Sequence, residues 1–461
     1  MTLSLDAPVI DGSTLDGADR PAPAAGPSLA ERAAADGVRF LLATFTTLTG
    51  KPCAKLVPVT AADAFEADGV GFAGYAAGAM GQQPRDPDIV AVPDVRSYTP
   101  IPSVRPGLAI VHCDPHVEGR PYAYAPRVIL RSMIDRARRE GLELVAGAEI
   151  EYFLVHRASD GSLVPADARD DAARPCYDAR GLTRMLDHLT TVSDVMAGLG
   201  WSPYASDHED GNGQFKKNFL HADVLTTADR VVTLRYVIQV LAEQRGMTAT
   251  FMPKPFSDRT GSGMHLHLSL WREGEALFPG TGDDPHGLGL SPTAYSFVAG
   301  LLEHAPALHA LIAPTVNSYK RTGATTTASG ATWAPRQASY GGNDRTHMVR
   351  VPDAHRVELR AGDGSANSYL AAAAALGAGL DGVQRGLDPG APGTAAPHSL
   401  PRTLLDAVAA LEASPVLRGV LDSVDPGAGV SDYYAELKRE EFYDWHGAVS
   451  PWEIDRYLTA V

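Results

Sequence analysis

Runs of β-branched and aromatic residues predict strands in the first third of the chain. Segment 37–59 contains two such runs on either side of a turn at Leu48–Lys51, and segments 70–76 and 108–114 are shorter runs of the same kind. We therefore expect a sheet built from these segments.

Helical spacing of apolar residues begins after that sheet. Segments 128–140 and 226–245 each place their apolar residues on one face and end before a glycine. Segment 368–383 is almost wholly small and apolar, which is typical of a helix buried among others. Helices and strands alternate without a repeat and without a glycine-rich strand-to-helix fingerprint.

The same patterns divide the chain into three parts. Residues 1–28 are rich in Ala, Pro, Gly and Asp, have no periodicity and predict a disordered tail. A boundary near Pro126 separates an N-terminal domain, 29–125, from a larger domain, 126–461.

Composition narrows the classes of function. The 461 residues include 40 Lys and Arg against 55 Asp and Glu, and the net charge of -15 has the wrong sign for binding nucleic acid or an anionic membrane surface. No apolar run is long enough to span a membrane, and residues 1–19 lack the features of a secretory signal. Three widely spaced cysteines without a CxxC pair predict a reducing, cytoplasmic location.

Three predicted strands present polar residues at every second position, so that these side chains share a face. The residues are Glu149 and Glu151; His265, His267 and Ser269; and Arg356, Glu358 and Arg360. Singly, each segment is typical of the solvated face of an antiparallel sheet. Together, carboxylates and imidazoles without thiolates are the ligand types of Mg²⁺ or Mn²⁺.

Arginines near these strands suggest a phosphate-bearing substrate. Between Arg321 and Arg360 there are six arginines and three acidic residues, a local charge of +3 in an acidic chain. Guanidinium groups beside metal-type carboxylates can neutralise a phosphoryl-transfer state, and ATP is the natural donor.

Several common catalytic motifs are absent from the sequence. There is no Walker A motif, so a nucleotide site would not be a P-loop. His208-Glu209 begins like HExxH, but Asn212 replaces the second histidine, and no GxSxG serine-hydrolase elbow occurs.

Six motifs, in order and at family spacing, carry a resemblance to the glutamine synthetase family. They are AEIEYFLV, DHEDGNGQF, ATFMPKP, GSGMHLHLSL, NSYKR and RVELRAGDGSANSYLAAAAAL, within a match from about Val38 to the C-terminus. DHEDGNGQF and SGATWAP resemble the type III-like branch, which includes γ-glutamylmethylamide synthetases.

The resemblance implies an α+β fold, with a β-grasp N-terminal domain and a catalytic domain whose curved antiparallel sheet forms a funnel. It also implies a dodecamer of two stacked hexamers, with active sites between neighbouring subunits. The implied reaction is phosphorylation of the glutamate γ-carboxylate by ATP with Mg²⁺ or Mn²⁺, followed by attack of an amine on the γ-glutamyl phosphate.

The resemblance also implies roles for individual residues. Ligands of the metal at the nucleotide phosphates would be Glu149, His265 and Glu358, and two ligands of the metal nearer glutamate would be Glu151 and Glu209. Glutamate would be bound by Glu151, Gly261, Arg321 and Arg360, and the catalytic residues would be Arg345, Glu358 and Arg360. The phosphates and nucleotide would be contacted by His267, Ser269, Arg345, Arg350 and Arg356.

One departure from the family pattern lies in the GQxE-type motif. The sequence reads Gly213-Gln214-Phe215-Lys216, so that a lysine stands where the third carboxylate ligand of the glutamate-side metal belongs. Either the ammonium replaces part of the cation's charge by pairing with Glu151 and Glu209, or the site is damaged and binds metal weakly.

Two further departures concern the acceptor. Ala73 stands where ammonia-using members have an aspartate, and no acidic residue lies between Arg321 and Asp344, where a flap glutamate is expected. Carboxylates there bind ammonium and take its proton, so their loss favours a bulkier or less basic nucleophile. We expect methylamine or another alkylamine, with hydrazine, hydroxylamine or ammonia as further acceptors.

Two alternatives to this ligase remain open. One is a true glutamine synthetase. The other is a catalytically silent relative with a binding or regulatory role, suggested by Lys216. The expected partners are the small molecules glutamate, an amine and ATP.

Overall fold

The computed structural model describes residues 26–282 and 284–460. Most of the predicted tail, 1–28, lies outside the described residues. Ser28, at its end, caps the first helix, because its side chain accepts a hydrogen bond from the backbone N–H of Glu31.

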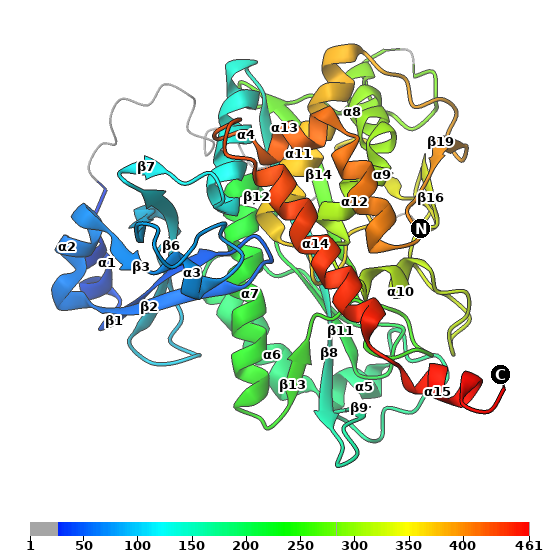
Figure 1. Cartoon of the computed structure of the whole chain (residues 1–461), viewed down its shortest axis with the longest axis horizontal. Coiled ribbons are helices and arrows are strands. Elements are labelled where there is room, and N and C mark those ends of the chain that lie inside the picture. Colours follow the sequence, from blue (N-terminus) through cyan, green and yellow to red (C-terminus); the bar gives the residue numbers. More distant parts are fainter. Residues whose placement is uncertain (1–25, 283, 461) are drawn as a thin grey trace, which may run out of the picture.

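A seven-stranded sheet dominates the N-terminal part, at the left of Figure 1, in the order β2-β1-β6-β4-β3, with β5 and β7 paired to β6. Its strands are β1 (Phe40–Thr46), β2 (Pro52–Pro58), β3 (Val70–Phe72), β4 (Ile89–Pro93), β5 (Thr99–Pro100), β6 (Leu108–Val117) and β7 (Arg120–Pro121). Three short helices accompany the sheet, α1 (Leu29–Ala35), α2 (Ala62–Asp68) and α3 (Gly74–Ala77).

The strand predicted over 70–76 is only partly correct. β3 ends at Phe72, and the next residues turn into α3 because the Ala76 and Ala77 N–H groups donate to the carbonyl of Ala73. A run of small residues satisfies either conformation, and the local hydrogen bonds decide between them.

A twelve-stranded sheet forms the larger part, in the order β10-β11-β8-β14-β18-β17-β16-β19. Its strands are β8 (Glu143–Arg157), β9 (Leu163–Pro165), β10 (Ser206–His208), β11 (Gln214–Asn218), β12 (Ala222–Asp223), β13 (Thr248–Thr250), β14 (Met264–Arg272), β15 (Glu275–Ala276), β16 (Gln337–Gly341), β17 (Val349–Asp353), β18 (Arg356–Leu359) and β19 (Ala395–Ser399). The sheet curves into a funnel, which is the predicted α+β architecture.

Helices cover the outside of this sheet, and α11 lies at their centre (Figure 1). They are α4 (Pro126–Arg139), α5 (Ala179–Arg184), α6 (Leu186–Gly198), α7 (Val224–Glu243), α8 (Pro292–Glu303), α9 (Ala305–Ile312), α10 (Ser318–Thr322), α11 (Ser368–Arg385), α12 (Leu404–Glu412), α13 (Pro415–Leu421), α14 (Val430–Gly447) and α15 (Pro451–Tyr457). The three long helices predicted from the sequence are confirmed as α4, α7 and α11.

Small residues let α8 and α11 approach closely. A side chain on Gly300 would lie 2.1 Å from the carbonyl oxygen of Ala378, so the two backbones touch where only glycine fits. This contact explains why 368–383 is both small and apolar.

A buried ion cluster joins the two parts of the chain. Arg127, at the start of α4, donates to Asp229 on α7 at 2.8 Å, to Asp114 on β6 at 2.6 Å and to Asp94 at 3.0 Å. The predicted boundary near Pro126 falls at the start of α4, and the division into domains stays a prediction.

The C-terminal arm consists of α14 and α15, Val430–Gly447 and Pro451–Tyr457. In both figures α14 crosses the larger part and α15 projects beyond the body of the chain. Among the described residues, no helix has the length and apolar character to cross a membrane.

Candidate active site

The three strands with alternating polar residues lie side by side in the large sheet. Antiparallel register places His265 on β14 opposite Glu149 on β8, and His267 opposite Glu358 on β18. Residues that are far apart in the sequence therefore converge on one face.

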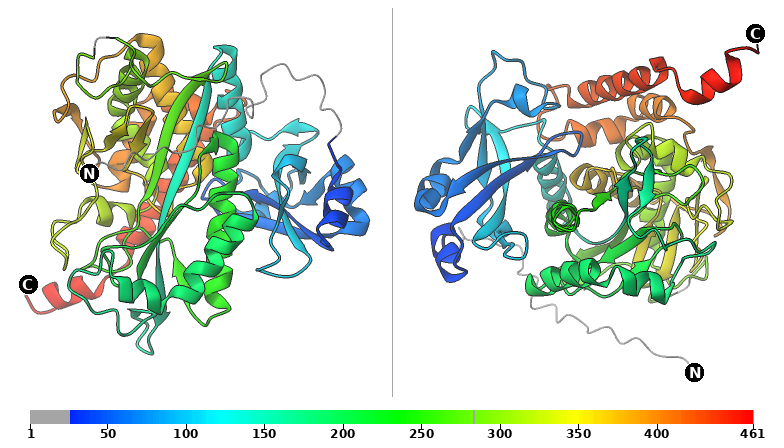
Figure 2. Two further views of the ribbon diagram at one scale, coloured as in Figure 1. Left: turned by 180° about the vertical axis from the view of Figure 1, so that it is seen from behind. Right: turned by 90° about the horizontal axis from the view of Figure 1, so that it is seen from below.

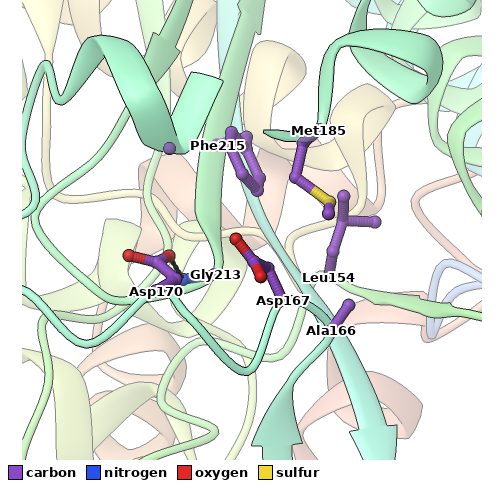
Figure 3. Close-up of a pocket in the computed structure, with 8 residues that line it drawn as sticks. Leu154, Ala166, Asp167, Asp170, Met185, Gly213 and Phe215 are labelled. Atoms are coloured by element: carbon purple, nitrogen blue, oxygen red, sulfur yellow. Dashed lines mark hydrogen bonds between the residues drawn. The ribbon is translucent and has the colours of Figure 1, made fainter. Parts of the chain in front are cut away.

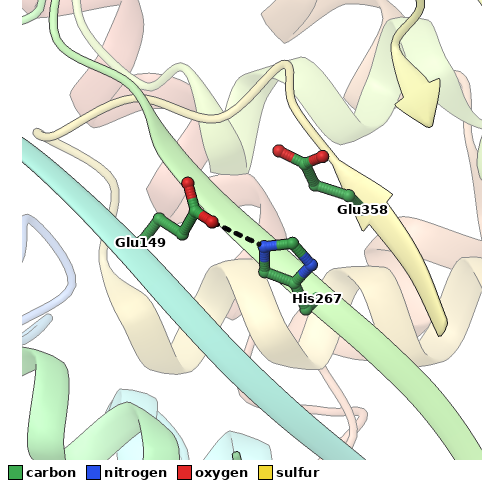
Figure 4. A group of neighbouring side chains, drawn as sticks. All are labelled: Glu149, His267 and Glu358. Carbon is green, nitrogen blue, oxygen red and sulfur yellow. Dashed lines mark hydrogen bonds and ion pairs between the residues drawn. The ribbon is translucent and has the colours of Figure 1, made fainter. Parts of the chain in front are cut away.

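A potential metal site lies where these strands meet, as Figure 4 shows. Ligand atoms of Glu149, His267 and Glu358 all lie within 4.8 Å of one another, and His267 Nε2 is 3.2 Å from Glu149 Oε1. His265 faces the same carboxylates, since its Nδ1 is 3.2 Å from Glu358 Oε1 and 3.5 Å from Glu149 Oε2.

The donor set suits a divalent cation. Nδ1 of His265 is buried and makes no hydrogen bond within the described residues. Burial, and then the charge of Arg360, lower the pKa of His265 and so favour the neutral ring that can ligate a metal. Two carboxylates and an imidazole match Mg²⁺ or Mn²⁺.

The carboxylates of this group are held ionised. Burial would raise the pKa of Glu358, but His265 and Arg360 outweigh it and lower the pKa to about 2. Burial opposes ionisation of Glu149 too, yet its contacts with His265 and His267 and the charge of Lys216 keep its pKa far below the usual value. Both groups are therefore anionic at neutral pH.

A second cluster, centred on Lys216, adjoins the first. Register pairs Lys216 on β11 with Glu151 on β8 and with Asp207 on β10. Nζ of Lys216 lies 2.9 Å from Glu209, 3.3 Å from Asp207 and 3.4 Å from Glu149. Asp207 was not predicted from the sequence, because its place opposite Lys216 depends on the pairing of β10 with β11.

The carboxylates of this cluster favour the protonated, ammonium form of Lys216. Burial would lower the pKa of Lys216, but the carboxylates of Glu209, Glu149 and Glu151 outweigh it and raise the pKa above its ordinary value. Burial, and then Glu151, raise the pKa of Glu209 against the effect of Lys216. On acidification Glu209 therefore takes up a proton while Lys216 keeps its own.

Only some of the predicted arginines reach the site. Arg350 and Arg360 each donate to a different oxygen of Glu358 at 2.6 Å. Arg345 is exposed on the loop before β17, and Arg356 is exposed and pairs with Asp353 at 3.3 Å. The first pair therefore contacts a carboxylate of the site, whereas the second pair is exposed to solvent.

The residues expected to bind glutamate also lie together. Arg321 on α10 is buried and donates to the backbone carbonyls of Ala361 at 3.0 Å and Arg360 at 3.3 Å. A side chain on Gly261 would approach the carbonyl of Pro253 to 2.3 Å and Cγ of Arg321 to 2.7 Å. Nearby, Glu151 accepts a hydrogen bond from the N–H of Gly263 at 2.6 Å.

Two positioning groups were not predicted from the sequence. Gln214 donates to the carbonyl of Gly261 at 3.0 Å and accepts from Thr260 at 2.9 Å, and so fixes the backbone at Gly261. Asp210 accepts from Trp333 Nε1 at 2.7 Å and also from Ser329, so it anchors the loop between α10 and β16. Gln214 stands in the GQ motif itself, which is the signal that could have revealed it.

The small hollow in Figure 3 belongs to the other face of the sheet. It is lined by Leu154 and Phe215, whose side chains alternate with those of the acidic cluster, and by Asp167 and Asp170. Asp170 accepts from His208 Nε2 at 2.9 Å and supports β10 from behind. The residues around this hollow therefore pack behind the site and help to hold its strands in place.

Comparison with known proteins gives a family and two kinds of relative. The family described as "Glutamine synthetase, catalytic domain" matches residues 123–457. The chain is 40% identical over 431 residues to a "Glutamine synthetase" of Rhizobium leguminosarum bv. phaseoli, covering 91% of this chain and 97% of the relative. It is also 40% identical over 435 residues to a "Glutamate--methylamine ligase" of Methyloversatilis universalis, covering 91% and 96%.

Solved structures agree with these relatives. The structure titled "GmaS/ADP complex-Conformation 1" superposes with a TM-score of 0.87 at 45% identity, covering 94% of this chain and 99% of that chain. "Apo GmaS without ligand" gives a TM-score of 0.86 at 44% identity, covering 94% and 100%.

Proposed function

The chain belongs to the glutamine synthetase family, and from this premise we propose that it joins the γ-carboxylate of glutamate to an amine, with methylamine as the first candidate. As a member of this family it is an ATP-dependent carbon–nitrogen ligase. The identity of the acid, the acceptor and the residues in each role form the proposal.

In the first half-reaction an oxygen of the glutamate γ-carboxylate attacks the γ-phosphorus of ATP, and ADP leaves. Glu149 and Glu358, with His265 or His267, would hold a divalent cation, which neutralises charge on the phosphates. Arg350 and Arg360 present guanidinium N–H groups beside that position.

Around the nucleotide, the proposed contacts are Ser269, Arg345 and Arg356, besides Arg350 and His267. Oγ of Ser269 and Nδ1 of His267 are buried without a hydrogen bond within the described residues, so both can still pair with a ligand. Arg345 and Arg356 are exposed, and their proposed contact with the nucleotide rests on the family resemblance.

For glutamate, Arg321 is proposed to bind the α-carboxylate and the backbone at Gly261 to meet the amino group. The support is geometric, because Arg321 is buried beside Gly261 and the Gln214 hydrogen bond fixes the glycine carbonyl. In the second half-reaction the amine attacks the γ-carbonyl carbon, phosphate leaves, and the proton that the nitrogen gives up goes to the leaving phosphate.

The choice of a substituted amine rests on two missing carboxylates. No carboxylate occurs between Arg321 and Asp344, and Ala73, exposed at the start of α3, stands where an aspartate would bind ammonium. Without these charges little selects a small cation. Ammonia remains the second candidate, because a relative named glutamine synthetase is as similar as the methylamine ligase.

The test is phosphate release from ATP and glutamate, screened against ammonium, methylamine, longer amines, hydrazine and hydroxylamine, with products identified by mass. We expect preference for a substituted nitrogen. Ala73→Asp should shift that preference toward ammonium, whereas Ala76→Asp, exposed in the same short helix, should not. Preference of the unmodified protein for ammonium would support glutamine synthetase, and no turnover with any acceptor would support a silent, binding role.

We also propose a dodecamer of two stacked hexamers. The support is the projecting C-terminal arm, on which Val449, Trp452 and Leu458 are 73%, 61% and 76% exposed. Apolar surface of this kind is typical of protein contacts. Sedimentation should give twelve times the chain mass, and removal of residues 449–461 should reduce it. A cytoplasmic location stays a prediction.

A further inference from the structure

Lys216 lies where a cation would be expected, inside a group of carboxylates. Its Nζ is within 3.4 Å of oxygens from Glu209, Asp207 and Glu149, and its side chain is only 16% exposed. Glu151, its register partner on β8, presents its side chain on the same face. The ammonium is therefore part of the site.

The strand geometry holds it there. β11 lies between β10 and β8, hydrogen-bonded to both, so the direction of the Lys216 side chain is set by the sheet. The residues on either side, Phe215 and Lys217, are buried on the opposite face. If the ammonium left the cluster, the carboxylates of Glu149, Asp207 and Glu209 would lose their counter-charge and repel one another.

The change in charge from glutamate to lysine indicates that Lys216 replaces a divalent ion. Exchanging a glutamate for a lysine changes the local charge by +2, which equals the charge of one Mg²⁺ or Mn²⁺ ion. An ion bound between Glu151 and Glu209 would also lie next to the ammonium, because Glu209 Oε1 is 2.9 Å from Nζ. The residues present therefore do not fit a divalent ion at this position.

We propose that Lys216 is a built-in second cation: its ammonium takes the place of the glutamate-side metal, and the chain binds one divalent ion, at Glu149, Glu358 and an imidazole. Lys216 is then a positioning residue, which holds Glu209 by an ion pair beside Glu151, its register partner. The inference rests on the proposed ligase function, but the number of bound ions does not depend on turnover.

The experiment counts Mn²⁺ bound to the full-length protein in the absence of nucleotide and glutamate, from the electron paramagnetic resonance of the free ion. We expect one tight ion per chain for the unmodified protein and two for Lys216→Glu. The matched control is Lys51→Glu, the same charge change at an exposed residue in the turn between β1 and β2, which should still bind one. Two ions on the unmodified protein, or one on a folded Lys216→Glu, would overturn the proposal.

A second variant keeps the test decisive if Lys216→Glu does not fold without metal. Lys216→Gln removes the charge and adds no carboxylate, so that the freed Glu209 and Glu151 should attract Mn²⁺. Its melting temperature should rise with Mn²⁺ more than that of the unmodified protein, whereas an equal rise in both would contradict the inference. Failure of the ligase assay would leave these ion counts and shifts unchanged.

Discussion

Replacing Lys217 with methionine should stabilise the protein at neutral pH. Lys217 is fully buried, and its Nζ donates to the Leu189 carbonyl at 2.7 Å, to Ser193 at 2.8 Å and to Ser206, with no carboxylate among these partners. Burial lowers its pKa from 10.5 to about 8, against the weaker opposing effect of Asp194 and Asp207. The folded state therefore carries a poorly compensated ammonium below that pH.

The sign and size of the effect of Lys217 on the pH dependence of stability follow from proton linkage. The pKa is lower in the folded state, so the unfolded chain binds more protons between pH 8 and 10.5 and stability rises with pH across that window. The full shift corresponds to about 3 kcal/mol, of which about 2 kcal/mol falls between about pH 7.5 and 9.5. Lys217→Met lacks this proton, so its stability should not show that rise.

The assay is urea unfolding at fixed protein concentration in chelator, at several pH values from about 7.5 to 9.5, for both proteins in parallel. Buried groups such as Tyr152 and Cys113, whose pKa values burial raises, affect the slopes of both proteins alike, so the difference between the two slopes reports Lys217. The neighbouring Lys216→Met is the control. It removes an ammonium from three carboxylates and should destabilise by about 2 kcal/mol or more. Equal pH slopes for the unmodified protein and Lys217→Met would refute the reasoning.

Three other substitutions test the glutamate pocket, the loop and the buried cluster. Arg321→Lys should raise the KM for glutamate by about 100-fold, because lysine cannot reproduce the guanidinium fork, while the KM for ATP changes little; steady-state kinetics with each substrate varied would check this. Asp210→Asn should loosen the loop held by Trp333 and increase phosphate release without amine, measured against amide formation, and an unchanged ratio would count against the anchor. Arg127→Leu leaves the buried Asp229 without its arginine, while Asp94 and Asp114 keep Arg131, and it should lower stability by about 3–5 kcal/mol in urea unfolding, whereas a loss below about 1 kcal/mol would show that the cluster relaxes.

The parts of the fold that could be predicted are those set by local periodicity. Polar Glu149 and Glu151 alternate with apolar residues, as do His265 and His267. This alternation identifies strands and also the face that each side chain occupies. The helices α4, α7 and α11 follow from their apolar stripes. A short element such as α3 does not, because four small residues carry too little pattern to distinguish a turn from a strand.

The parts that could not be predicted depend on pairing between distant segments. Nothing local to β10 indicates that Asp207 lies opposite Lys216, and nothing local to Asp210 indicates that Trp333, 123 residues later, donates a hydrogen bond to it. The two adjacent lysines illustrate the limit. Lys216 and Lys217 are identical in sequence terms, yet the register gives one the carboxylates of the site and buries the other behind the sheet.

Glu149 contacts both cation positions, the ammonium of Lys216 and the proposed metal site. One of its oxygens lies 3.4 Å from Lys216 Nζ and 3.5 Å from His265 Nδ1, and the other lies 3.2 Å from His267 Nε2. The ammonium therefore draws on the same negative charge that a divalent ion at Glu149 and Glu358 would use, and it weakens that ion's attraction to the site. A lysine at this position both replaces one cation and tunes the affinity for the other, so the two positions have to be treated as one electrostatic unit.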